Sequence, residues 1–97
     1  MADKLTGSKR QEALEKLPNW KEIDRRDAIT RTFTFTDFSA AFAFMTRVAL
    51  RAEQMDHHPE WFNVYNRVEV TLATHDASGV TQKDIDLAIF MDGLAVS

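Results

Sequence analysis

Hydrophobic and polar residues alternate along two stretches of the chain, which predicts β-strands. Residues 29–35 alternate apolar side chains with three threonines, although Arg31 interrupts the apolar row. Residues 68–74 repeat the pattern with valine and leucine. A period of two is typical of a strand with one buried face. Two shorter strands are expected at residues 20–23 and 62–65, joined to these by polar turns at 24–27 and 66–67.

Three other stretches have helical spacing and helix-start signals. A short helix is predicted over residues 8–17, where Ser8 and Gln11 have the spacing of a capping box. A long helix is expected to start at Thr36 or Asp37 and to end near residue 55. The last helix is predicted to start at Thr81, with Asp84 three residues later, and to run to about residue 93.

The long helix is apolar around much of its circumference. A stripe of five residues is expected to cover the sheet: Phe38, Phe42, Met45, Val48 and Ala49. Residues 40–45 are apolar all round, and a helix with two apolar faces needs two partners. The face that carries Phe44 is therefore predicted to form a subunit interface of a homodimer or homotetramer. The alternative is that the small domain folds around both faces by itself.

The predicted order of elements is α-β-β-α-β-β-α, which indicates an α+β fold. Because the strands form hairpins, a four-stranded antiparallel sheet with the helices packed on one face is expected. The 97 residues fit one domain, predicted over residues 8–97, with residues 1–7 as a flexible N-terminus.

Composition narrows the possible functions. The chain has no cysteine, so disulfides and thiolate nucleophiles are excluded. Its formal charge of −3, with both signs interspersed, argues against a nucleic-acid binder. Neither a signal peptide nor a run of the ~20 apolar residues that a membrane span needs is evident. A cytoplasmic protein with no membrane contact is expected.

All three histidines, His57, His58 and His75, fall within the 21 positions from Asp56 to Asp76. Histidine exchanges protons near neutral pH because its unperturbed pKa is ~6.5. The first two follow the predicted long helix, and His75 follows a predicted strand. If those ends adjoin, the imidazoles converge into a proton-transfer site, with Trp61 placed to wall a pocket for a flat ligand.

Other interpretations of these residues stay open. A metal site is disfavoured because adjacent histidines point in different directions, and its fourth ligand would be Glu53, Asp56 or Asp76. Trp61 can be a packing residue. On a helix, Glu53 would share a face with His57 and orient its imidazole, or form a solvated pair.

The spacing of these residues resembles the pterin-4a-carbinolamine dehydratase family. Glu53 is separated by three residues from His57-His58-Pro59, and Tyr65 follows after five more residues. His75 follows after nine more residues and Asp84 after eight. The resemblance covers residues 8–95. It implies the α-β-β-α-β-β-α fold, dimers or tetramers, and dehydration of 4a-hydroxytetrahydrobiopterin to quinonoid dihydropterin in tetrahydrobiopterin recycling, without metal or cofactor.

The resemblance also implies roles for individual residues. His57 and His75 would act as acid and base on the pterin's C4a hydroxyl, and His58 would mainly orient the ring. The supporting or substrate-binding residues would be Glu53, Asp56, Trp61, Ala73, Thr74 and Asp84, with backbone groups at Ala73 and Thr74 meeting the pterin's amide edge. Asp84 also has a simpler explanation as helix-start chemistry.

Two further functions are compatible with the sequence. One is a binding module of the same fold that dimerises a protein partner through the long helix. A transcription-factor partner would apply only to an animal-type member. Lys83 and Ala77 depart from the arginine and cysteine of animal relatives, which argues against that partner more than against catalysis. The other is a small metalloprotein.

Overall fold

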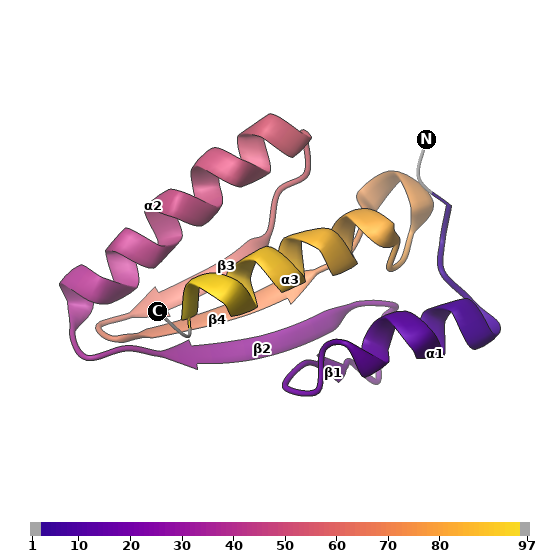
Figure 1. The fold of residues 1–97 in the computed structure, drawn as a ribbon, viewed down its shortest axis with the longest axis horizontal. Coiled ribbons are helices and arrows are strands. Elements are labelled where there is room, and N and C mark those ends of the chain that lie inside the picture. The colour runs from indigo at the N-terminus through magenta and orange to yellow at the C-terminus, as the bar shows by residue number, and fades with distance from the viewer. Residues whose placement is uncertain (1–2, 96–97) are drawn as a thin grey trace.

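Three α-helices and four strands follow the predicted order in the computed structural model, which describes residues 3–95 (Figure 1). A short 3-10 helix, η1, which the sequence did not indicate, lies between the last strand and the last helix. The elements are α1 (Gly7–Glu15), β1 (Lys21–Glu22), β2 (Ile29–Thr34), α2 (Phe38–Met55), β3 (Glu60–Val64), β4 (Arg67–Leu72), η1 (His75–Ala77) and α3 (Gln82–Ala95).

The strands form one antiparallel sheet in the order β1-β2-β4-β3. Helices α2 and α3 lie on the same face of this sheet (Figure 1). That face carries the buried row Val68, Val70 and Leu72 of β4, which packs with Ile29 and Phe33 of β2. The α+β fold class is therefore confirmed.

The inward face of α2 differs from the predicted one. Its buried residues are Ala41, Phe44, Val48 and Ala52. Phe44 is only 5% exposed, and its ring centroid lies 4.8 Å from that of Phe33. The prediction that the Phe44 face is a free subunit interface is therefore wrong. A helix that is apolar all round does not reveal which face turns inward, and here Phe33 of β2 and Phe35, just after it, pack against Phe44.

The helix starts are partly as predicted. Asp37 caps α2, since its side chain accepts a hydrogen bond from the Ala40 N–H at 2.8 Å. The expected capping box at the start of α1 is wrong, because the N-cap is Thr6 without a side-chain bond. The helix instead begins at Gly7, whose φ of +59° suits glycine.

The β3–β4 hairpin turns on Tyr65, which has a φ of +50°, rather than on the Asn66 that the sequence favoured. Phe62 and Tyr65 are both exposed, so neither joins the core. Trp61 packs against the core instead. The strand begins two residues earlier than predicted, at Glu60.

Arg31, the exception in the apolar row of β2, has a partner on α3. Its guanidinium donates to the Asp92 carboxylate at 2.5 Å and lies 4.2 Å from the centroid of the Phe33 ring. The indole N–H of Trp20 donates to the same carboxylate at 2.9 Å. The positive charge of Arg31 is therefore paired with Asp92, and this ion pair ties α3 to the sheet.

The segment before α1 contacts the start of α3. The Leu5 N–H donates to the Val80 carbonyl at 2.7 Å, and Lys4 pairs with Thr81 in an isolated antiparallel β-bridge. Residues 1 and 2 of the expected flexible N-terminus lie outside the described residues. Over residues 3–95, no helix is long and apolar enough to cross a membrane.

Candidate active site

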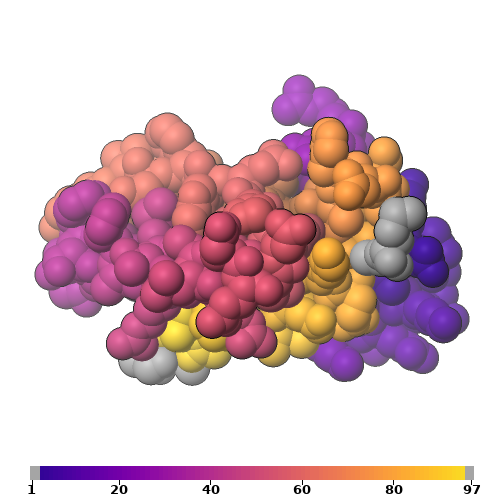
Figure 2. Space-filling model, turned by 90° about the horizontal axis from the view of Figure 1, so that it is seen from above, coloured from indigo at the N-terminus to yellow at the C-terminus, as the bar shows by residue number. Residues whose placement is uncertain are grey.

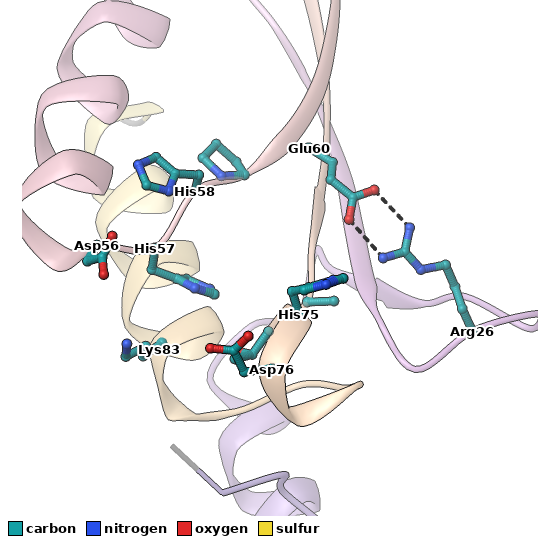
Figure 3. A pocket seen from close by; sticks show the side chains of 11 residues that line it. Arg26, Asp56, His57, His58, Glu60, His75, Asp76 and Lys83 are labelled. Atoms are coloured by element: carbon teal, nitrogen blue, oxygen red, sulfur yellow. Dashed lines mark hydrogen bonds and ion pairs between the residues drawn. The ribbon is translucent and has the colours of Figure 1, made fainter. Parts of the chain in front are cut away.

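The three histidines come together at one end of the sheet. His57 and His58 lie between α2 and β3, and His75 opens η1 just after β4. All three line a cavity of about 420 Å³. In Figure 2 the end of α2 borders the orange segment of η1 and the start of α3, and the purple β1–β2 turn projects beyond them. The three histidines therefore lie at one site, as predicted, but their rings point in different directions (Figure 3).

The end of α2 sets the directions of the first two histidines. Asp56 adopts a left-handed conformation with φ of 51°, which ends the helix. The His57 N–H still bonds to the Ala52 carbonyl at 3.0 Å, so this residue is held against the last turn. Pro59 then directs the chain into extended backbone. His57 consequently turns inward, whereas His58 points outward.

His57 is bound to a buried carboxylate. Its Nε2 lies 2.5 Å from Oδ1 of Asp84, whose side chain is fully buried. Oδ2 of Asp84 accepts hydrogen bonds from the Thr74 hydroxyl at 2.8 Å and from the Thr81 N–H at 2.9 Å. Both carboxylate oxygens are therefore hydrogen-bonded, which is what a buried charge requires.

Asp84 serves the start of α3 at the same time. Its bond from the Thr81 N–H, together with the Lys83 N–H donating to the Thr81 hydroxyl at 3.3 Å, forms the predicted capping box. The two interpretations of Asp84 are thus compatible, because its two oxygens serve the helix start and the imidazole separately.

His58 has a different environment. Its Nε2 lies 2.8 Å from Oε1 of Glu53, and the two side chains are 58% and 80% exposed. The predicted pairing of Glu53 with His57 is wrong, since the helix ends before His57 and the i,i+4 geometry no longer holds. Glu53 therefore supports the outer histidine.

His75 is exposed at the start of η1 and lines the same cavity, and in Figure 3 its ring points towards the Arg26–Glu60 pair. A reciprocal bridge holds its loop, because the Thr74 N–H donates to the Gly79 carbonyl at 2.8 Å and the Gly79 N–H donates to the Thr74 carbonyl at 3.3 Å. The backbone of Thr74 is therefore engaged within the protein. Ala73, just outside the paired strand, lines the cavity.

The other predicted site residues divide into two groups. Asp56, Ala73 and Thr74 line the cavity with the histidines. Trp61 is half-buried against the core and is not among the residues that line the cavity. Within residues 3–95, no group of three or more histidine and carboxylate side chains is arranged to hold a metal ion.

Four lining residues were not predicted as part of the site, namely Arg26, Pro59, Glu60 and Lys83, and Asp76 was considered only as a metal ligand. The guanidinium of Arg26 forms two hydrogen bonds of 2.8 Å with the Glu60 carboxylate and closes one side of the cavity (Figure 3). These bonds lower the pKa of Glu60 and raise that of Arg26. No local sequence signal shows which residue of the polar turn at 24–27 faces the site.

Comparisons with known proteins agree with this geometry. A family model described as pterin 4 alpha carbinolamine dehydratase matches residues 3–94. A protein from Burkholderia multivorans that carries the name pterin-4-alpha-carbinolamine dehydratase is 59% identical over 95 residues, covering 98% of this chain and 93% of the relative. One of the same name from Rhodopseudomonas palustris is 61% identical, with 98% and 94% covered.

Solved structures give the same picture. A crystal structure from Brucella melitensis, described as a transcriptional coactivator/pterin dehydratase, is similar with a TM-score of 0.92 and 57% identity, over 96% of this chain and 99% of that one. A pterin dehydratase-like protein described as a RuBisCO assembly factor shares the fold alone, with a TM-score of 0.69 and 22% identity. With a family model over nearly the whole chain and relatives near 60% identity, this chain belongs to the pterin-4a-carbinolamine dehydratase family.

Proposed function

We propose that this protein dehydrates 4a-hydroxytetrahydrobiopterin to quinonoid dihydropterin by histidine acid–base catalysis, as a step in tetrahydrobiopterin recycling. The observation that carries the proposal is the meeting of His57, His58 and His75 in one cavity, with His57 held by a buried carboxylate. Family membership supports the same reaction.

The reaction needs one proton delivered and one removed. The C4a–O bond breaks as the hydroxyl takes a proton and leaves as water, and N5 loses its proton as the C4a=N5 double bond forms. Two groups that exchange protons near neutral pH can do this without a metal, and such assistance is typically worth ~10²–10⁴-fold in rate. His57 and His75 are assigned to the two transfers because they reach the cavity from different elements.

Asp84 prepares His57 for this role. An ionised carboxylate only accepts hydrogen bonds, so Nε2 of His57 donates to Asp84 and Nδ1 stays available for proton exchange. The same negative charge stabilises the imidazolium that forms when His57 takes up a proton. His58, which is exposed and paired with Glu53, is better suited to orienting the pterin at the cavity mouth.

The test is stopped-flow absorbance of 4a-hydroxytetrahydropterin decay, with and without the protein, in buffer containing EDTA. We expect clear acceleration over the spontaneous rate, which would also exclude a chelatable metal. A folded protein that gives no acceleration would overturn the proposed activity and favour the binding-module function.

We also propose that the protein self-associates through the outward face of α2. Phe38 and Phe42 are 50% and 56% exposed there, with ring centroids 5.8 Å apart. Burying such rings is worth ~1.5–3 kcal/mol each, a useful addition for a domain this small. Sedimentation should show an oligomer that Phe42→Asp dissociates, whereas an unchanged sedimentation coefficient would place the interface elsewhere.

A further inference from the structure

The turn between β1 and β2 lies at the end of the sheet where the active site is built. Glu22 pairs with Ile29, and Ile29 pairs with Leu72 at the end of β4. On the other side of β4, Glu60 at the start of β3 pairs with Thr71. The turn therefore stands beside both chain segments that carry histidines.

Arg26 of this turn is bound to the first segment. Its two terminal nitrogens donate to the two oxygens of Glu60, each at 2.8 Å, across 34 positions of sequence. Glu60 follows His58 with only Pro59 between them. A bidentate arginine–carboxylate pair fixes orientation as well as distance, which a single-contact surface pair does not.

Asp27, the next residue, is bound to the second segment. Its Oδ1 accepts the Val80 N–H at 3.1 Å and lies 2.9 Å from a terminal nitrogen of Arg10. The approach is close, because a Cβ at Gly79 would lie 2.7 Å from Oδ2 of Asp27. Gly79 is bridged to Thr74, the residue before His75. Asp27 thus holds the loop that begins with His75.

We infer that Arg26 and Asp27 are positioning residues for the dehydratase reaction, which fix the His57–His58 segment and His75 at their working separation across the cavity. This inference rests on the proposed function. Arg26 lines the cavity, but its hydrogen bonds go to Glu60, so it acts through the start of β3. Figure 3 shows the pair closing the side of the cavity next to His75.

The test compares Arg26→Gln with a matched surface variant, Arg67→Gln. The Arg67–Glu69 pair lies within β4, and its side chains are 49% and 46% exposed, against 47% and 56% for Arg26 and Glu60. Because misplacing reacting groups by ~1 Å can cost ~10²-fold, we expect Arg26→Gln to lower kcat roughly 10- to 100-fold with little change in KM. Arg67→Gln should keep wild-type kcat and KM.

A charge exchange separates positioning from substrate contact. The double variant Arg26→Glu with Glu60→Arg restores the pair in the opposite direction and should recover most of the lost kcat. Asp27→Asn should lower kcat in the same way. Equal kinetics for Arg26→Gln and Arg67→Gln would overturn the inference, as would a loss confined to KM that the exchange does not rescue, since that would make Arg26 a substrate ligand.

A spectroscopic readout keeps this test independent of the activity itself. The imidazole ¹H–¹³C resonances of His57 and His75 should shift in Arg26→Gln and Asp27→Asn and remain in place in Arg67→Gln. If the wild-type protein showed no dehydratase activity, the proposed function would fail, and shifted resonances would still show that the turn positions the histidines. Unshifted resonances would overturn the positioning role whatever the activity.

Discussion

Two histidines that are neighbours in sequence occupy opposite environments. His57 is buried and bonded to Asp84, whose carboxylate is fully enclosed and accepts two more hydrogen bonds. His58 is exposed and bonded to Glu53, which is more exposed still. A histidine–carboxylate pair is therefore buried in one place and exposed to solvent in the other. Burial, rather than residue type, is therefore what distinguishes the two roles that we propose for these histidines.

The largest loss of activity should come from replacing the buried histidine, His57. His57→Gln keeps an N–H that can donate to Asp84 but removes the proton exchange, so we expect kcat to fall by ~10²–10⁴-fold. Stopped-flow assays measure this, with His58→Gln as the matched variant, which should mainly raise KM. Equal losses of kcat in the two variants would mean that the histidines share the chemistry.

A second effect concerns the buried acceptor. Asp84→Asn replaces an acceptor by an amide, so one of the groups that now donate to it loses its partner. We expect the free energy of unfolding to fall by about 1–3 kcal/mol. Urea denaturation measures this loss, and kcat should fall with it because the imidazole is no longer held. Unchanged stability would show that neighbouring groups or water replace the carboxylate.

A third prediction concerns how stability depends on pH through Asp27, a partly buried carboxylate. Burial alone would raise the pKa of Asp27, but the Val80 N–H and Arg10 outweigh it and lower that pKa. An acid with a lowered folded-state pKa stabilises the fold above its unfolded-state value, and this contribution is lost as pH falls through the folded-state pKa. Stability should therefore decline on acidification, with a shallower decline in Asp27→Asn. Equal slopes would remove Asp27 from this explanation.

The smallest change in activity should come from the exposed pair of His58 and Glu53. Glu53→Gln removes a charge from a solvated pair, and such pairs contribute little, so activity should change by less than about fivefold. The same assay should show this small effect shrinking further in high salt, because exposed charges are screened. A loss comparable to that of His57→Gln would show that Glu53 has a direct part in proton transfer.

The order of elements was predictable because residues 29–34 and 67–72 alternate and the long helix has a clear start at Asp37. The inward face of α2 was not predictable, because apolar residues surround the helix and only packing against the rings of Phe33 and Phe35 decides which ones are buried. Boundaries at the short strands were also missed, since a strand as short as β1 has too few residues for a period.

In the site, the spacing of the histidines and Asp84 identified the residues that converge. The partner of Glu53 was mistaken, because the left-handed Asp56 ends the helix before the i,i+4 relation reaches His57. The Arg26–Glu60 pair had no signal at all, since its residues are 34 positions apart and meet only when the sheet forms.

Because Asp84 lies in the first turn of α3 and also binds His57, local unfolding of that turn also frees the His57 side chain. Opening of that turn releases the carboxylate, and the imidazole then loses its anchor. Helix ends open more readily than the interior of a fold. Under the proposed function, the closed population of that single helical turn limits the fraction of molecules competent for proton transfer, and hydrogen exchange at the Asp84 amide can report it.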